Sequence, residues 1–148
     1  MADVGTLEDT ARAMVAHGKG VLAIDESVST CSKRFAEAGI ESTEDSRRDY
    51  REMLITTPGI GEYVSGAILY DETIRQKAAD GRAMAEVLRV QGMIPGIKVD
   101  AGTKPLAGAP GETVTEGLDG LAGRLNEYRD IGARFTKWRA VIRIARGM

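Results

Sequence analysis

The sequence has little cysteine and little histidine, and this scarcity excludes several kinds of site. Its 148 residues contain one cysteine, Cys31, and one histidine, His17. A single cysteine cannot form an intramolecular disulfide, and it excludes a cysteine-rich metal site. A single histidine excludes a histidine-based catalytic triad and a multi-histidine metal site. We therefore expect Cys31 to be a small buried or half-buried side chain, and His17 to be structural.

The chain also lacks a strong charge of either sign and a long apolar run. The formal net charge is −2 with charged residues at 28%, so bulk attraction to nucleic acid or to an anionic membrane is not indicated. No stretch is apolar for long enough to span a bilayer, and the N-terminus lacks the basic-then-apolar pattern of a secretory signal. The sequence predicts a cytoplasmic protein whose residues 1–148 belong to one domain, with no internal boundary.

Helical and strand patterns alternate along the chain. Apolar residues at helical spacing predict helices, and short apolar runs predict strands. Strands separated by helices predict βαβ units and a parallel sheet, hence an α/β fold. The predicted helices cover 6–16, 33–38, 78–90 and 118–131, with one more from a capping box at 42–45 to Pro58; the predicted strands cover 22–25, 63–70, 94–100 and 135–144, and a loop rich in glycine and proline covers 101–111.

Three of the predicted strands carry charged residues where a buried strand should have none. Asp25 ends the first run, Lys98 and Asp100 end the third, and Lys137 and Arg139 lie in the last. Burying an unpaired ion costs several kcal/mol or more, so a fold keeps such residues mainly where they pair, bind charged ligands or do chemistry.

The strand period separates these charges from the apolar residues, because alternate side chains point to opposite faces. We expect helices to cover the apolar side of each strand, while the other side faces a polar interior. In the last run the polar side holds Lys137, Arg139, Val141 and Arg143, and the apolar side holds Trp138, Ala140, Ile142 and Ile144.

Two interpretations of the charged runs stay open on residue types alone. The charges can form interior salt bridges that merely close a polar barrel. Alternatively, clustered cations and desolvation lower a lysine pKa enough for proton transfer near neutral pH, while arginines supply fixed charge for phosphate. A dinucleotide fingerprint at 18–23 (GKGVLA) is rejected, because its glycines enter a strand instead of leaving one.

Six motifs in order give the chain a resemblance to a known family. From about Gly18 to Ile144 it resembles class I fructose-bisphosphate aldolase. The resemblance implies a (β/α)8 barrel that cleaves fructose 1,6-bisphosphate reversibly into glycerone phosphate and glyceraldehyde 3-phosphate, through a lysine Schiff base and without a metal or other cofactor. The motifs are GKGVLAIDES, SRRDYREML, GAILYDETIRQK, GIKVDAG, PLAGAPGETVTEGLDGL and FTKWRAVIRI.

The resemblance also implies roles for single residues. Asp25 matches the aspartate beside the Schiff-base centre, and Lys137 matches a barrel lysine that contacts substrate and aids proton transfer. Thr30 stands where the family has a serine, and Val28 and Ser29 replace a Thr-Gly pair. The residues implied to bind the sugar bisphosphate are Thr30, Arg34, Arg47, Lys98 and Arg139, the last a basic neighbour whose charge tunes the site.

The sequence departs from the family pattern in its extent. Only four β/α units can be placed, whereas a (β/α)8 barrel has eight strands and about 250 residues. In the family the Schiff-base lysine comes from strand six and the acid-base glutamate from strand five, and neither motif occurs here. We therefore expect the N-terminal half of a barrel, inactive alone and homo-oligomeric when full length. The alternative is a noncatalytic module that binds sugar phosphates or a complementary half barrel.

Overall fold

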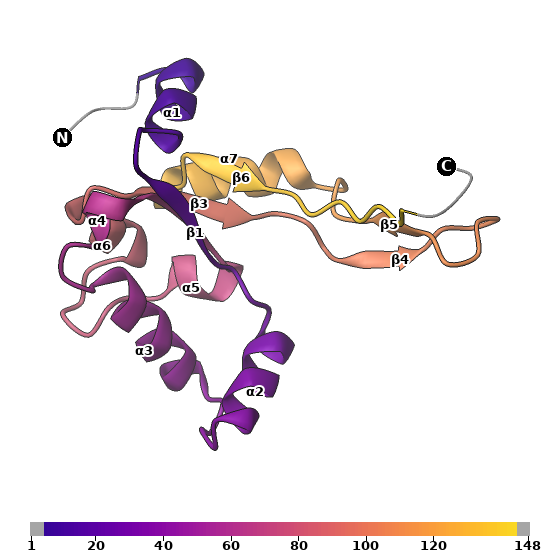
Figure 1. Ribbon diagram of the computed structural model, residues 1–148, viewed down its shortest axis with the longest axis horizontal. Coiled ribbons are helices and arrows are strands. Elements are labelled where there is room, and N and C mark those ends of the chain that lie inside the picture. Colours follow the sequence, from indigo (N-terminus) through magenta and orange to yellow (C-terminus); the bar gives the residue numbers. More distant parts are fainter. Residues whose placement is uncertain (1–4, 145–148) are drawn as a thin grey trace.

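Four parallel strands form the centre of the fold. The computed structural model describes residues 5–144. The strands are β1 (Gly20–Ile24), β2 (Val64–Leu69), β3 (Ile94–Lys98) and β6 (Phe135–Lys137), in the sheet order β1-β2-β3-β6 (Figure 1). Each neighbouring pair is parallel, with helices in the connections. The predicted α/β fold with a parallel sheet of about four β/α units is confirmed.

Seven helices accompany the strands in the described part of the chain. Side-chain caps start three of them. The capping box of α3 lies one residue later than the predicted box at 42–45, since the Thr43 side chain and Ser46 bond reciprocally. Gly39 and Gly132 follow α2 and α7 with positive φ, the conformation that glycine adopts readily. The helices are α1 (Leu7–Met14), α2 (Val28–Glu37), α3 (Glu44–Ile55), α4 (Ile60–Tyr63), α5 (Asp71–Arg75), α6 (Met84–Val90) and α7 (Leu121–Ile131).

Three helices begin at residues that differ by three or more from the sequence-based prediction. Helix α7 begins at Leu121 and not at residue 118, because Gly120 has a positive φ of 66°. Helix α2 begins at Val28 and not at Lys33, because the Ser27 hydroxyl caps the helix by accepting from the backbone N–H of Thr30 at 3.3 Å. Helix α6 begins at Met84, since the preceding residues form a turn closed by a bridge between Lys77 and Ala83. Helix α5 was not predicted, as its five residues are too few to show a helical period.

The segment predicted as a loop over 101–111 contains a strand. Strand β4 (Thr103–Pro105) pairs antiparallel with β5 (Thr113–Thr115), and this hairpin projects from the rest of the molecule (Figure 1). Each strand has three residues, too short for an alternating pattern to stand out among the glycines. The hairpin base is held by the Ala101 N–H, which donates to the Glu116 carbonyl at 2.8 Å.

Strand β6 is much shorter than the predicted run over 135–144. It pairs with β3 from Phe135 as far as Lys137, and the pairing stops there because β3 itself ends at Lys98. The covered apolar side predicted for this run is therefore wrong beyond Trp138, which packs partly against the core. Ile142 and Ile144 are 73% and 92% exposed.

The two faces of the sheet follow the predicted alternation. On the core face, the row Ile24, Leu69 and Ile97 runs across three strands in register and is fully buried. Helical side chains cover this row, so the apolar side is packed as expected. They include Ile55 of α3, Ile74 of α5, Met84, Val87 and Leu88 of α6, and Tyr128 of α7.

The opposite face, here called the inner face, carries the in-register row Ala23, Ile68, Gly96 and Phe135. The Phe135 ring lies against the two glycines of this face. A Cβ atom added to Gly96 would lie 2.3 Å from ring atom Cζ, and one added to Gly66 would lie 3.1 Å from Cε1. Glycine at both positions therefore lets the ring lie close to the sheet.

Candidate functional site

The charged residues of three strands meet at one end of the inner face. Lys98 and Lys137 are the last residues of β3 and β6 and pair in register, while Asp25 directly follows β1. Because the strands are parallel, their carboxyl ends lie at the same end of the sheet, where α/β folds place their ligands. The structure thus brings together three residues that the sequence analysis selected separately.

Asp25 and Lys137 form an ion pair across the sheet. Lys137 Nζ lies 2.7 Å from Asp25 Oδ2, and the two side chains are 32% and 11% exposed. Their strands, β1 and β6, are the two edges of the sheet. In a flat sheet, three strand spacings would separate these edges by about 14 Å, more than two side chains of this size bridge comfortably. The contact therefore requires a sheet that curves toward its inner face, as barrel strands do.

Lys98 forms the second ion pair of the site, with Asp100. Its Nζ lies 2.7 Å from Asp100 Oδ1 and donates to the Asp100 carbonyl at 2.8 Å. The Asp100 carboxylate also accepts from the backbone N–H groups of Gly102 and Arg139, both at 3.2 Å. Burial raises the pKa of Asp100, but the Lys98 ammonium and these two N–H groups outweigh burial, so the pKa lies below its ordinary value.

Among the described contacts, no side chain of Thr30, Arg34 or Arg139 bonds to the two ion pairs; Arg139 reaches Asp100 through its backbone N–H alone. Thr30 sits in the first turn of α2, with its hydroxyl 3.0 Å from that of Ser27. Arg34, in the last turn of the same helix, pairs with Glu26. The backbone carbonyl of Arg139 accepts from the Thr115 hydroxyl at 2.7 Å, while the residue as a whole is exposed.

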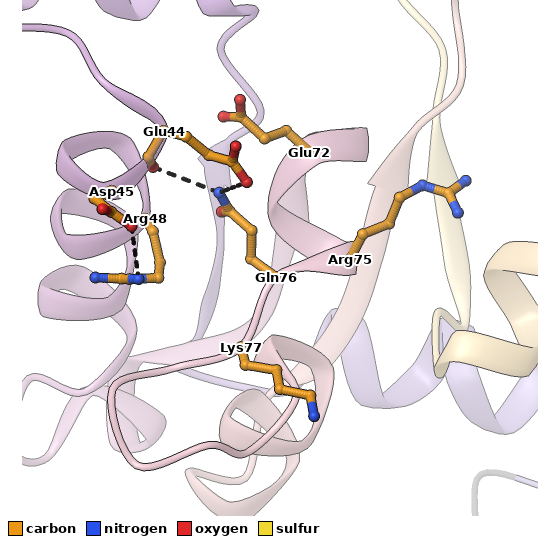
Figure 2. A pocket seen from close by; sticks show the side chains of 7 residues that line it. All are labelled: Glu44, Asp45, Arg48, Glu72, Arg75, Gln76 and Lys77. Carbon is orange, nitrogen blue, oxygen red and sulfur yellow. Dashed lines mark hydrogen bonds and ion pairs between the residues drawn. The ribbon is translucent and has the colours of Figure 1, made fainter.

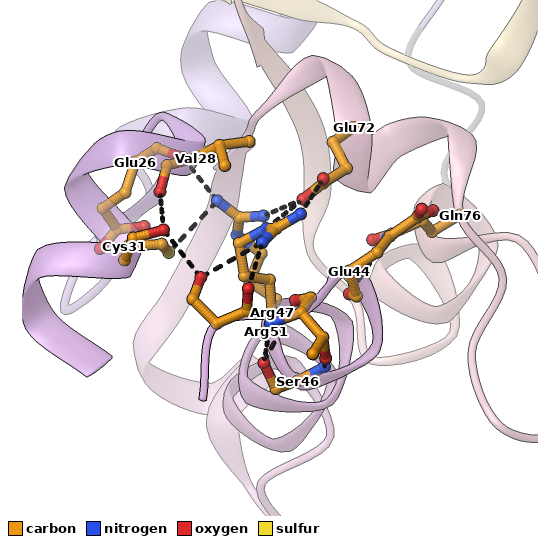
Figure 3. A network of polar contacts seen from close by, with 12 residues as sticks. Glu26, Val28, Cys31, Glu44, Ser46, Arg47, Arg51, Glu72 and Gln76 are labelled. Atoms are coloured by element: carbon orange, nitrogen blue, oxygen red, sulfur yellow. Dashed lines mark hydrogen bonds and ion pairs between the residues drawn. The ribbon is translucent and has the colours of Figure 1, made fainter. Parts of the chain in front are cut away.

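Arg47 is buried and engaged in a network centred on Glu72 (Figure 3). Its Nε and Nη2 donate to the two Glu72 carboxylate oxygens at 2.8 and 2.6 Å. The hydrogen bonds and charge of Arg47, followed by the charge of Arg51, hold the pKa of Glu72 below its ordinary value despite partial burial. The structure does not bring Arg47 into contact with Asp25, Lys98 or Lys137 through any described hydrogen bond or ion pair.

Arg51 is the main residue of this network that sequence reasoning missed. Its side chain is 0% exposed; Nη2 donates to the Glu26 carbonyl at 2.6 Å, and Nη1 lies 3.5 Å from Glu72. Arg51 Nη2 also lies 3.7 Å from Sγ of Cys31, which is buried as expected. Arg47 and Arg51 stand four residues apart, so they share one helix face. That spacing was the available signal, but it is equally typical of a solvated face.

A second group of charged side chains lines an open cavity between α3 and α5. Figure 2 shows this cavity, with a volume of about 450 Å³. Its two arginines have partners: Arg48 lies 2.9 Å from Asp45, and Arg75 lies 2.6 Å from Glu127. None of the predicted site residues lines it. The lining residues are Glu44, Asp45, Arg48, Glu72, Arg75, Gln76 and Lys77.

The described residues contain neither a metal-binding cluster nor a membrane-spanning helix. Within residues 5–144, no group of three or more His, Cys, Asp or Glu side chains is placed to hold a metal ion. No helix in the same part of the chain has the length and hydropathy needed to cross a bilayer.

Comparison with known proteins agrees with the geometry. The family model described as "Glycolytic: Fructose-bisphosphate aldolase class-I" matches residues 6–148. The chain belongs to this family. A probable class 1 fructose-bisphosphate aldolase of Xanthomonas axonopodis pv. citri (strain 306) is 65% identical over 138 residues, which are 93% of this chain and 41% of the relative.

Other fructose-bisphosphate aldolases give the same result. A chloroplastic fructose-bisphosphate aldolase of Arabidopsis thaliana is 50% identical over 141 residues, covering 95% of this chain and 36% of that protein. A crystal structure of fructose-bisphosphate aldolase from Plasmodium falciparum superposes with a TM-score of 0.86 at 48% identity, covering 88% of this chain and 38% of that one. The fold is thus part of the aldolase α/β barrel. The chain spans about two fifths of the length of the relatives it matches.

Proposed function

We propose that this chain contributes the first half of the active site of a class I fructose-bisphosphate aldolase. The reaction is the reversible, metal-independent cleavage of fructose 1,6-bisphosphate into glycerone phosphate and glyceraldehyde 3-phosphate through a lysine Schiff base. The observation that carries the proposal is the ion pair of 2.7 Å between Asp25 and Lys137, at the carboxyl end of a curved parallel sheet in a chain of this family.

Asp25 and Lys137 are proposed to handle protons near the reacting carbon. A distance of 2.7 Å between Nζ and Oδ2 is short enough for direct proton exchange between the two groups. Asp25 then assists carbinolamine and carbon–carbon bond steps, and Lys137 donates to a substrate oxygen. Lys137 does not form the imine, because its TKWR motif resembles that of the other barrel lysine.

The cations around this pair are proposed to bind the phosphates. Lys98 lies in register with Lys137 on the neighbouring strand, and Arg139 lies two residues after Lys137. Lys98 and Arg139 can therefore hold an anionic group beside the Asp25–Lys137 pair. Thr30 and Arg34 of α2 add a hydroxyl and a guanidinium. The proposal also includes Arg47, whose Nε and Nη2 donate to Glu72.

The isolated chain is proposed to be catalytically inactive, because the imine-forming lysine and the acid-base glutamate belong to strands that it does not contain. Borohydride trapping with glycerone phosphate tests this directly. We expect no covalent labelling of the 148-residue chain. Labelling of any lysine would show that the nucleophile has been assigned wrongly.

A chimera tests whether the chain carries half of a working site. This chain would be fused to the part of the Xanthomonas relative that follows the matched region, and cleavage of fructose 1,6-bisphosphate would be measured in a coupled assay. We expect activity in the chimera, a loss of at least about a hundredfold for Lys137→Met, as is usual when an acid-base group is removed, and no loss for the exposed Lys104→Met control. Equal activity of the two variants would refute the assigned role of Lys137.

The alternative function, a noncatalytic module that binds sugar phosphates or a half barrel, predicts a different result for the isolated chain. A folded monomer that binds fructose 1,6-bisphosphate with micromolar affinity in calorimetry would favour that alternative. The proposed half site predicts millimolar binding at best, since the groups that would enclose the substrate lie on the missing strands.

Two further predictions concern the full-length protein. We propose that it is a homo-oligomer, which light scattering after size-exclusion chromatography would test. We also propose a cytoplasmic location, although some matched relatives are named chloroplastic, and a fluorescent fusion would test it.

A further inference from the structure

Asp100 connects the two lysine-bearing strands of the site through a single carboxylate. Oδ1 accepts from Lys98 Nζ at 2.7 Å and from the Gly102 N–H at 3.2 Å, while Oδ2 accepts from the Arg139 N–H at 3.2 Å. Arg139 lies two residues beyond Lys137 on the segment that leaves β6. One side chain therefore fixes both the ammonium group that ends β3 and the backbone that follows β6.

The carboxylate itself has little freedom to move. Its side chain is 2% exposed. The backbone on both sides is anchored, since the Val99 N–H donates to the Lys137 carbonyl at 3.1 Å and the Ala101 N–H donates to the Glu116 carbonyl at 2.8 Å. A surface ion pair can reorient without loss, but a pair with both backbone flanks bonded cannot.

The donors of Lys98 show what this arrangement leaves available. An ammonium group has three N–H donors. Asp100 takes two of them, one with Oδ1 at 2.7 Å and one with its backbone carbonyl at 2.8 Å. Among the described residues no other acceptor bonds to Lys98 Nζ, so one donor remains. An ammonium group held by two acceptors presents its third N–H in a fixed direction, which costs less ordering when an anion binds.

We propose that Asp100 is a positioning residue of this site, which holds Lys98 with one N–H left for the phosphate of a sugar phosphate and fixes Arg139 beside it. The proposal rests on the proposed function for the identity of the ligand. The hold on Lys98 and Arg139 does not depend on it, and the two parts are tested by different measurements.

NMR on the chain with ¹⁵N-labelled lysine and backbone tests whether Asp100 holds the Lys98 ammonium group in place. We expect the Lys98 ammonium protons to exchange with solvent at least about tenfold more slowly than those of the exposed residues Lys33, Lys77 and Lys104, since two acceptors protect them. A Lys98→Arg sample assigns the signal. This measurement needs no change at Asp100, so it decides the question even if variants there fail to fold. Exchange as fast as in the exposed lysines would overturn the proposal.

Asp100→Asn is the matched test, with Asp119→Asn as the control that removes the same charge from an exposed position. In Asp100→Asn we expect the slow Lys98 signal to disappear and the Arg139 amide proton to move upfield, while Asp119→Asn leaves both unchanged. A merely structural role would instead change amide signals throughout the chain. Unchanged Lys98 and Arg139 signals in folded Asp100→Asn would refute the hold.

Titration with fructose 1,6-bisphosphate tests the link to the ligand. We expect the wild-type chain to show weak saturable shifts at Lys98, and Asp100→Asn to bind at least about fivefold more weakly than Asp119→Asn, because one charge-assisted contact is no longer oriented. Equal affinities would overturn the positioning role. Slow Lys98 exchange without any bisphosphate binding would instead contradict the proposed ligand and support the hold alone.

Discussion

The contact between Gly96 and the Phe135 ring leads to a sharp prediction for the substitution Gly96→Ala. The new Cβ would lie 2.3 Å from Cζ and 2.5 Å from Cε1 and Cε2 of the ring. Carbon atoms in contact normally lie about 3.5–4.0 Å apart, so the ring must move by more than about 1 Å. Gly96 has no positive φ, so an alanine backbone is allowed and the effect arises from packing alone.

The expected magnitude combines two opposing terms. Overpacking of this kind costs about 1–3 kcal/mol. Replacing glycine by alanine recovers about 0.4–1 kcal/mol, because the unfolded chain loses conformational freedom. We therefore expect a net loss of about 1–2 kcal/mol in the free energy of unfolding. At this chain length that loss lowers Tm by about 2–8 °C.

Urea denaturation followed by circular dichroism measures the effect, with two controls. Gly123→Ala lies in α7, where the new Cβ meets no heavy atom within 4 Å apart from its chain neighbours and the backbone of its own helix, so it should stabilise the protein by about 0.5–1 kcal/mol. In a Phe135→Leu background the ring is absent, and Gly96→Ala should cost at least about 1 kcal/mol less than in the wild type. The reasoning is refuted if Gly96→Ala costs the same in both backgrounds, or if it costs nothing.

Three more predictions concern the network around Glu72. Arg51→Met should lower the free energy of unfolding by about 2–4 kcal/mol in urea titrations, because it leaves the Glu26 carbonyl and a Glu72 oxygen short of a buried donor. The surface change Arg48→Met should lower it much less. Similar losses in the two variants would contradict the role given to Arg51. The pKa of Glu72 is lower in the folded than in the unfolded chain, so Glu72 contributes stability above its unfolded pKa of about 4.3, and this stability is lost as the pH falls through the folded pKa. The difference between the unfolding free energies at pH 6 and pH 3 should therefore be smaller in Glu72→Gln than in the wild type. Burial raises the pKa of the Cys31 thiol, so a disulfide reagent at pH 8 should label the native chain slowly and the urea-unfolded chain at once; rapid native labelling would show that the side chain is accessible.

The charged end of the inner face could be predicted from the sequence because two simple rules apply there. Strand alternation assigns a face to each residue, and parallel pairing brings the carboxyl ends of all strands to one edge. Together they bring Asp25, Lys98 and Lys137 close to one another without any knowledge of the intervening helices. The Lys98–Asp100 pair follows from these rules, because both residues lie on the same face at the end of one strand. The Asp25–Lys137 pair also requires the curvature of the sheet, which the rules do not predict.

Other features could not be predicted because their cause lies in distant parts of the chain. Arg51 can be buried only because its guanidinium bonds to Glu72, 21 residues away, and to the backbone carbonyl of Glu26. Strand β6 ends at Lys137 because its neighbour β3 ends at Lys98, which the pattern of the run 135–144 does not report. The β4–β5 hairpin depends on pairing between two three-residue segments, each too short to carry a period of its own.

The ion pair between Asp25 and Lys137 has a consequence for the order of folding. The two residues are 112 positions apart, and their strands are the two edges of the sheet, so the contact forms only after all four strands have assembled. Closing so long a loop is slow and entropically costly, so we expect the local helices to form earlier in refolding. Trp138, the single tryptophan, adjoins Lys137 and packs partly against the core. Its fluorescence should therefore change in the last refolding phase, when the halves of the charged site meet.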